Sequence, residues 1–265
     1  YYSISTYPLI EGGDILGVVE ISRDITAEIN SQKNMMQHEK LASIGRLSAG
    51  VAHEINNPLT TILTTSMLLQ EETSPQDPMY AELETIAKET LRCRKIVTSL
   101  LDFARQTKPD KKEHDLNDII KESLLLVKKQ AAFKDVSVEQ ELATNLPHVL
   151  VDKGQIQQAL INLVLNAIEA TAAGGYVRVL TRNVPENREI QVSVSDNGEG
   201  ISETNLVKIF DPFFTTKGDG SGLGLAITHG IVEQHNGSIG AESRLGHGTT
   251  FTIKLPLAKD MTHEH

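Results

Sequence analysis

The 265-residue sequence is poor in cysteine, in long apolar runs and in positive charge. Its single cysteine, Cys93, excludes a disulfide framework and a multi-cysteine zinc site, and favours a reducing compartment. No run of about 18 apolar residues is present, so no bilayer-spanning helix is predicted, and there is no signal peptide. With 25 basic and 35 acidic residues, the net charge of −10 argues against a nucleic-acid partner, although a local basic pocket for a polyphosphate stays open.

Residues 1–30 have the pattern of a β-hairpin that ends in an exit to a helix. β-Branched and other apolar residues form two predicted strands around a turn at 11–14, and Asp24 is a candidate helix N-cap. A hairpin this short cannot hold a core of its own. Because the sequence begins at Tyr1, inside a predicted strand, we expect it to be a piece of a longer chain.

Residues 31–107 are predicted to form a hairpin of two long helices, separated by a Pro-containing turn at 74–78. In the second helix, apolar and small residues recur at the three-and-four spacing of a heptad seam. These residues are Leu83, Ile86, Thr90, Cys93, Val97, Leu100 and Ala104. A single hairpin would leave this seam in water, so we expect a homodimer in which two hairpins form a four-helix bundle, with Cys93 in its core.

A charged linker is expected at 108–114, and residues 115–258 then alternate between helical and strand patterns before a polar tail at 259–265. Helices are predicted at about 115–133, 152–172 and 222–234, and strands at 136–142, 176–182, 190–195, 238–243 and 250–255. Helices over one face of a mostly antiparallel sheet make an α/β sandwich. The predicted fold class is therefore α+β, a dimerising helical hairpin followed by an α/β-sandwich domain.

The first chemical motif, at 53–59, is His-Glu-Ile-Asn-Asn-Pro-Leu on the first predicted helix. It approaches the zinc-protease pattern His-Glu-x-x-His, but Asn57 replaces the second histidine and a zinc ligand is lost. A polar helical surface is the plain alternative. Pro58, however, costs about 3 kcal/mol within a helix and bends it beside His53, which favours a site. A neutral imidazole is a nucleophile, Glu54 could take its proton, and Asn57, one turn further on, could hold a water.

Two motifs suit the phosphates of a nucleotide. Asn162 and Asn166 are four apart on a predicted helix, so their carboxamides share one face and suit a hydrated Mg²⁺. The alternative, a pair of solvated positions, fits poorly with their apolar flanks. Four alternating glycines at 218–224 precede a helix, where bare backbone N–H groups bind phosphate, and Lys217 lies beside them. The spacing is neither a Walker loop nor a Rossmann loop, and a flexible hinge is the alternative.

Three loops complete the set of motifs. Asp196-Asn197-Gly198-Glu199-Gly200 follows a predicted strand. Asn-Gly alone signals a hairpin, but two glycines leave room for a flat ring, and a buried Asp196 could accept the amino group of adenine. Residues 210–214 hold three of the six phenylalanines and either anchor a mobile lid or pack as an ordinary loop. Residues 246–251 form a turn into the last strand and carry little information alone.

In this order, the five motifs make residues 40–257 resemble the transmitter region of bacterial sensor histidine kinases. The resemblance implies a dimerisation and histidine-phosphotransfer hairpin followed by a Bergerat-type ATP-binding domain that uses ATP and Mg²⁺. It also implies autophosphorylation and transfer to an aspartate in the receiver domain of a cognate response regulator. A cytoplasmic location follows from this resemblance, with any membrane tether upstream of Tyr1.

The resemblance assigns roles to single residues. His53 would be the phospho-acceptor, Glu54 its acid–base partner, and Asn57 the residue for dephosphorylating the regulator. Asn166 would hold Mg²⁺. The other implied ATP-binding residues are Asn162, Asp196, Gly198, Gly200, Lys217, Gly220, Gly222, Leu223, Gly224 and Thr249. Position 169 is glutamate where many members carry lysine, which resembles the nitrogen-regulator-like branch and leaves Lys217 to supply the cation.

Residues 1–30 resemble the closing strands of a PAS sensor domain, with Asp24-Ile25-Thr26 as its exit motif. Two rival functions stay open. ATPases of the same nucleotide fold, such as gyrase, chaperone and mismatch-repair relatives, lack a histidine motif on a bundle helix. A scaffold that only dimerises would not need Asn166, Asp196 or the glycine loop. The sequence does not identify the signal, the regulator, or whether transfer runs within a chain or across the dimer.

Overall fold

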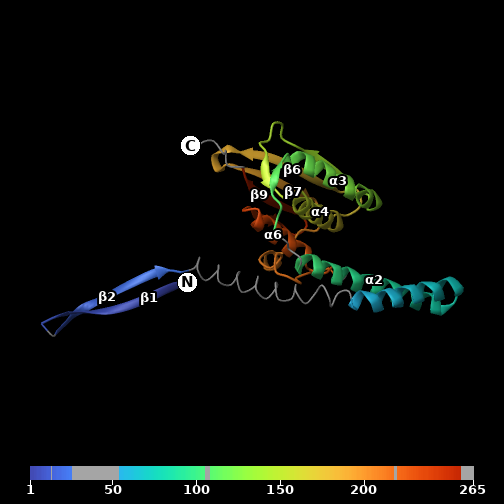
Figure 1. The fold of residues 1–265 in the computed structure, drawn as a ribbon, viewed down its shortest axis with the longest axis horizontal. Coiled ribbons are helices and arrows are strands. Elements are labelled where there is room, and N and C mark those ends of the chain that lie inside the picture. The colour runs from blue at the N-terminus through green and yellow to red at the C-terminus, as the bar shows by residue number, and fades with distance from the viewer. Residues whose placement is uncertain (13, 26–53, 105–107, 218–219, 258–265) are drawn as a thin grey trace.

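The computed structural model describes residues 1–12, 14–25, 54–104, 108–217 and 220–257 (Figure 1). Strands β1 (Tyr2–Glu11) and β2 (Asp14–Asp24) pair antiparallel, as the sequence predicts. Most of the large apolar side chains of this hairpin are exposed, because two strands have no second layer to cover them. Asp24, the predicted N-cap, is the last residue of β2. The helix that it would cap and the predicted phospho-acceptor His53 fall within 26–53, outside the described residues.

The helical hairpin consists of helical residues 54–72 and of α2 (Pro78–Ala104). Residues 73–77 turn between them, and the Asp77 carboxylate accepts the N–H of Met79 (2.8 Å), one of the free donors at the start of α2. Such a short turn makes the two helices antiparallel neighbours (Figure 1). Their facing sides bury Ser66, Leu83 and Thr90.

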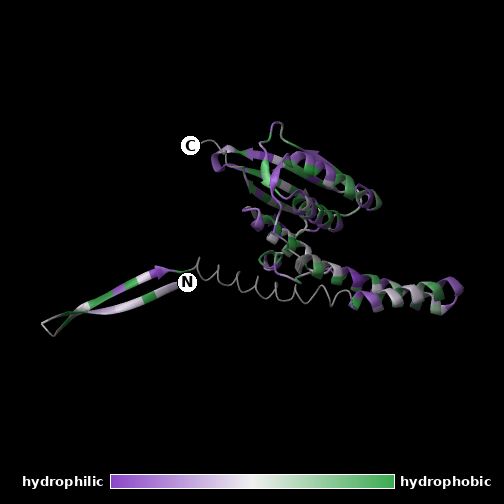
Figure 2. Cartoon of the chain, in the orientation of Figure 1, coloured by the Kyte–Doolittle hydropathy of each residue, from purple (hydrophilic) through white to green (hydrophobic). Residues whose placement is uncertain are grey.

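The heptad seam of α2 divides into two stripes. Leu83 and Thr90 are buried within the hairpin, whereas Ile86 and Cys93 are exposed in the single chain. The prediction that Cys93 is a core residue is therefore not met within one chain. Figure 2 shows apolar positions along both helices, and several of the large ones are exposed. The exposed set includes Ile55, Ile62, Met67, Leu68, Leu69, Met79, Ile86 and Leu91.

The following domain is built on a five-stranded sheet with the order β4-β6-β7-β9-β8. Strand β4 pairs parallel with β6 at one edge, and the other neighbours are antiparallel. Side chains of the central strands alternate between buried and half-buried, which is the period of a sheet covered on one face. The strands are β4 (Ser137–Glu141), β6 (Tyr176–Val184), β7 (Glu189–Asp196), β8 (Ser238–Ser243) and β9 (Thr249–Pro256).

Three long helices cover the buried face of this sheet (Figure 1), which confirms the predicted α/β sandwich. They are α3 (Leu116–Phe133), α4 (Lys153–Ala170) and α6 (Gly224–Gln234). Leu163, Ile168 and Ile253 are among the fully buried side chains, each of which stabilises the fold by roughly 1.5–3 kcal/mol. Among the described residues, no helix combines the length and the apolarity that crossing a membrane requires.

Short elements account for the differences from the predicted pattern. Strand β3 (Lys112–His114) pairs antiparallel with β5 (Val149–Val151), so the predicted linker at 108–114 ends in a strand. A 3₁₀ turn (Pro185–Asn187) and α5 (Glu203–Leu206) were also not predicted. A three-residue strand has no periodicity to recognise, and β5 is fixed by burial of its two valines.

A polar junction joins the linker to two helices. The Asp152 carboxylate caps α4 by accepting the Gln155 N–H (3.1 Å), and it also accepts the N–H of Asp110 (3.0 Å). The Asp152 N–H donates to Nε2 of buried His235 (2.9 Å), at the end of α6. Because Nε2 accepts a proton donor, the ring proton lies on Nδ1, which donates to the Ile231 carbonyl (2.7 Å).

Candidate functional site

Asp196, the last residue of β7, is the centre of the candidate site. Its Oδ1 accepts the N–H groups of Gly198 (2.9 Å) and Thr249 (3.2 Å). Burial raises the pKa of the Asp196 carboxyl, while these two hydrogen bonds and the charge of Lys217 act against the rise. Among the described residues nothing donates to Oδ2, so this oxygen can accept an amino group from a ligand.

Ser243, which sequence reasoning missed, fixes the surroundings of Asp196. Its Oγ accepts the N–H of Ile201 (2.8 Å), donates to the carbonyl of Gly248 (2.9 Å), and lies 2.9 Å from Oγ1 of Thr249. Because Ser243 has one hydroxyl proton and gives it to Gly248, the Thr249 hydroxyl must donate to Ser243. The lone pairs of Thr249 Oγ1 are therefore open to a donor on a ligand. A lone serine carries no motif that could have revealed this.

The glycines after Asp196 allow close backbone packing. A Cβ on Gly198 would lie 2.3 Å from the carbonyl oxygen of Ala170, at the end of α4. Gly200 has a φ of +70°, and a Cβ there would lie 2.2 Å from the carbonyl oxygen of Arg244. The predicted reason for these glycines was space for a flat ring. The structure adds that the loop is pressed between α4 and the β8–β9 turn.

Asn162 and Asn166 lie half-buried on α4, on the face that the sequence predicts they share. Asn162 Nδ2 donates to the Gly224 carbonyl (3.3 Å) and so touches the start of α6. The Asn166 carboxamide makes no hydrogen bond within the described residues, which leaves its oxygen free for a ligand. Those residues contain no cluster of three or more His, Cys, Asp or Glu. An amide oxygen such as that of Asn166 is a ligand that suits a Mg²⁺ which keeps waters and phosphate oxygens.

The glycine loop packs against the preceding Phe-rich segment. Gly222 has a φ of +67°, and a Cβ there would lie 2.4 Å from the backbone of Phe213. Leu223 is fully buried in the core, where its side chain packs, and its part in ATP binding stays a prediction. Within the loop, the N–H of Gly220 donates to the Lys217 carbonyl (3.3 Å) and the N–H of Leu223 to Ser221 Oγ (3.4 Å).

The phenylalanines at 210–214 divide between core and surface. The Phe210 ring lies 5.2 Å from that of His229 and 6.5 Å from that of Phe251, and Phe214 packs against the core. Phe213 is 55% exposed and has a positive φ of 67°. Of the two predicted alternatives, ordinary packing describes Phe210 and Phe214, and only Phe213 points to solvent.

Lys217 reaches across to the asparagine helix. Its ammonium lies 2.8 Å from Oε2 of Glu169. Glu169 cannot supply a cation, as the sequence indicates, but the ion pair has no sequence signature because the two residues are 48 positions apart.

Glu54 and Asn57 begin the described part of the first helix, and both are exposed. Asn56 turns inward, and its Oδ1 is buried without a hydrogen-bond partner in the described residues. Position 53 lies outside the described residues, so the structure gives no distance between the histidine motif and the Asp196 site. The two halves of the predicted chemistry are therefore seen separately.

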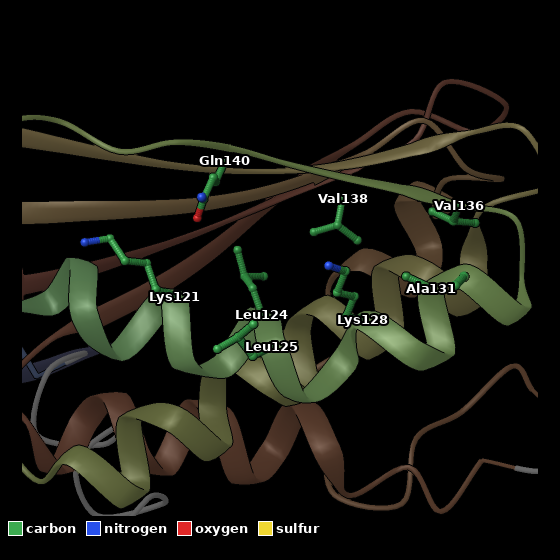
Figure 3. Close-up of a pocket in the computed structure, with 9 residues that line it drawn as sticks. Lys121, Leu124, Leu125, Lys128, Ala131, Val136, Val138 and Gln140 are labelled. Atoms are coloured by element: carbon green, nitrogen blue, oxygen red, sulfur yellow. The ribbon is translucent and has the colours of Figure 1, made fainter.

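A cavity of about 480 Å³ lies elsewhere, between α3 and the edge strand β4 (Figure 3). Lys121, Leu124 and Lys128 extend from the helix toward Val138 and Gln140 of the strand. None of the predicted site residues lines this cavity. This cavity is therefore separate from the candidate site around Asp196.

The domain is an α/β sandwich with a buried acidic acceptor, two asparagines on one helix and a glycine loop, and a helical hairpin precedes it. These features are those of a nucleotide-binding module joined to a phospho-acceptor domain. Residues 43–109 match the His Kinase A (phospho-acceptor) domain. Residues 151–259 match the family of histidine kinase-, DNA gyrase B- and HSP90-like ATPases. Together the two ranges cover more than half of the chain, and the chain belongs to the sensor histidine kinases.

Individual proteins agree with this assignment. The histidine-protein kinase AtoS of Escherichia coli (strain K12) is 38% identical over 92% of this chain, and the chain spans 40% of that protein's length. Full-length ShkA in complex with AMPPNP is 27% identical, with a TM-score of 0.66 over 81% of this chain and 46% of that one. The kinase ThkA in complex with the response regulator TrrA is 29% identical, with a TM-score of 0.63 over 98% of this chain and 76% of that one.

Proposed function

We propose that this chain uses ATP to phosphorylate His53 and then passes the phosphoryl group to an aspartate of a response regulator. One observation carries the nucleotide half of the proposal. Asp196 is buried, two backbone N–H groups hold its Oδ1, and its Oδ2 is left to accept a donor. The motif at His53 and the family of the chain support the acceptor half.

In the proposed complex, the amino group of adenine donates to Asp196 Oδ2, close to the open acceptor of Thr249. The phosphates extend toward Asn162, Asn166 and Lys217 and toward the backbone N–H groups of the glycine loop. Asn166 would hold Mg²⁺ through its amide oxygen. When bound, Mg²⁺ supplies neutralisation of phosphate charge. The protein contributes by orienting the phosphate chain and by shielding the adenine end from water.

In the transfer step, one ring nitrogen of His53 forms a bond to the γ-phosphorus. The bond from that phosphorus to the β–γ bridging oxygen breaks, and ADP leaves. The other ring nitrogen gives up its proton to Glu54, so the phosphorylated ring is neutral. The phosphoryl group then passes to a carboxylate of the regulator as the bond from nitrogen to phosphorus breaks. Glu54 returns the proton to the ring, and neutral His53 is restored.

We also propose a homodimer as the working form. Ile55, Ile62 and Leu69 are exposed at intervals of seven, and Ile86 and Cys93 extend an exposed stripe on α2. Two copies of the hairpin would cover these stripes in a four-helix bundle. We further propose the domain limits 31–107 for this hairpin and 115–258 for the ATP domain, with residues 1–30 as the end of a PAS-like domain.

The test is incubation of the chain with γ-labelled ATP and Mg²⁺. We expect one label per chain that is lost in acid and kept in base, as for phosphohistidine. His53→Gln should abolish the label while calorimetry still shows ATP binding and sedimentation still shows a dimer. Persistence of the acid-labile label in this variant would refute His53 as the acceptor. If the natural chain dimerises but neither binds ATP nor takes up label, the scaffold alternative is correct.

A further inference from the structure

An ion pair crosses the candidate nucleotide site. Lys217 Nζ lies 2.8 Å from Glu169 Oε2, and each side chain is about one-third exposed, at 36% and 35%. Glu169 follows Asn166 by three positions on α4, so the two side chains lie on the same side of the helix. The pair therefore lies beside the residues that we propose contact the phosphates.

The backbone around Lys217 is fixed on the same side. The hydroxyl of Thr215 accepts the N–H of Lys217 (3.1 Å) and lies 3.3 Å from its carbonyl oxygen, closing a local turn. The charge of the ammonium also opposes the rise that burial causes in the pKa of the Asp196 carboxyl. Without nucleotide, the charge of Lys217 is thus already directed into the site, with Glu169 as its direct partner.

We propose that Glu169 is the counter-ion that the phosphates of ATP replace, an inference that rests on the ATP-binding function proposed above. Glu169 neutralises Lys217 in the nucleotide-free protein. When ATP enters, the ammonium exchanges the carboxylate for phosphate oxygens, and Glu169 is left to water. No bond or proton changes in this exchange. Glu169 thus competes with the phosphates for Lys217 and lowers the affinity for ATP.

The proposal predicts an unusual direction for a substitution at a binding site. Glu169→Gln removes the carboxylate that competes for Lys217 and that repels the phosphates. We expect the dissociation constant of ATP with Mg²⁺, measured by calorimetry, to decrease about two- to fivefold, the range for breaking a partly exposed ion pair. If Glu169 instead kept Lys217 against the phosphates in the complex, the same substitution would weaken binding.

A double-mutant cycle gives the sharper test. Lys217→Gln loses the contact with phosphate. In the natural background it also removes the ion pair, so ATP binding no longer includes the cost of breaking that pair. Its effect on ATP binding should therefore be about two- to fivefold larger in the Glu169→Gln background than in the natural one. An equal or smaller effect in that background would overturn the proposal.

Glu199→Gln is the matched control. Glu199 is an exposed carboxylate near Asp196, and it does not pair with Lys217. Removing its charge can shift ATP affinity through space but should leave the effect of Lys217→Gln unchanged. If Glu199→Gln enlarged that effect as much as Glu169→Gln, the ion pair would not be the cause and the proposal would fail. Absence of ATP binding by the natural chain would instead refute the proposed function.

Discussion

The helical hairpin and the ATP domain bury their apolar residues to different extents. Among the described residues of the hairpin, Leu83 is the only buried large apolar side chain, and residues such as Ile62 and Leu69 are about half exposed. The ATP domain buries a continuous core that extends from α3 to β9. This difference fits an ATP domain that holds its own core, and the proposed dimer, in which a second copy would complete the core of the hairpin.

The largest expected effect comes from deleting matched aliphatic groups in the two regions. Leu163→Ala, at a fully buried site on α4, should destabilise the ATP domain by about 2–5 kcal/mol because it leaves a cavity. Ile62→Ala should leave that domain unchanged and shift the dimer toward monomer. A ligand stabilises only the unit that binds it, so ATP should raise the unfolding temperature of the ATP domain alone. Calorimetry can therefore identify the transition of this domain. Sedimentation reports the dimer. An unaltered monomer–dimer equilibrium in Ile62→Ala would contradict the proposed bundle.

The next effect tests the proposed adenine acceptor in the self-contained domain. Asp196→Asn keeps an oxygen for the N–H groups of Gly198 and Thr249 but places an amide nitrogen where Oδ2 was. A donor would then face the amino group of adenine, and ATP binding should weaken by roughly 10- to 100-fold, the cost of an unpaired polar contact. Titration calorimetry measures this, with a preserved unfolding temperature as the control. If the affinity for ATP were unchanged, Asp196 would not be the acceptor for the amino group of adenine.

A smaller effect is expected in the dimerising region. Asn57 is exposed on the helix, where it could hold a water for removing phosphate from the regulator. Asn57→Ala should keep autophosphorylation and slow the decay of phosphorylated regulator by roughly two- to tenfold, the value of one neutral hydrogen bond. The measurement is loss of label from purified phospho-regulator. If the natural chain and the Asn57→Ala variant gave the same decay rate, Asn57 would have no role in dephosphorylating the regulator.

The smallest effect is a pH dependence confined to the ATP domain. Burial lowers the pKa of His235 below its ordinary value of 6.5, and the charge of Lys111 adds to this, while the hydrogen bond to Ile231 and the charge of Asp152 oppose it. The unfolded chain therefore takes up this proton first, so stability is full above about pH 6.5 and decreases below it. One proton limits the slope to about 1.4 kcal/mol per pH unit. His235→Gln should flatten the urea-unfolding profile, whereas His247→Gln, at an exposed position, should leave it unchanged.

Local patterns predicted the elements that carry their own signal. Apolar alternation predicted the strands of the large sheet, and the helix predicted at about 152–172 corresponds to α4. The candidate loops were also visible, since glycines and polar residues recur there at short intervals. What could not be predicted depends on distant contacts. Strand β5 forms only against β3, and Cys93 belongs to the stripe that faces away from its own hairpin.

The same distinction applies to the site. Asp196, Asn162 and Asn166 could be chosen from their motifs, but the ion pair of Lys217 with Glu169 and the bridging hydroxyl of Ser243 could not. Ser243 has a function only because β8 brings it beside Thr249, and Glu169 only because the loop folds Lys217 over α4. Such residues are found by their partners and have no sequence pattern of their own.

The junction at Asp152 has a mechanical consequence. One carboxylate holds Asp110 and the first turn of α4, and the N–H of the same residue holds the end of α6 through His235. These hydrogen bonds connect the end of the linker to α4 and to the end of α6. If the domain moves to bring ATP to the acceptor histidine, these three segments would therefore move together.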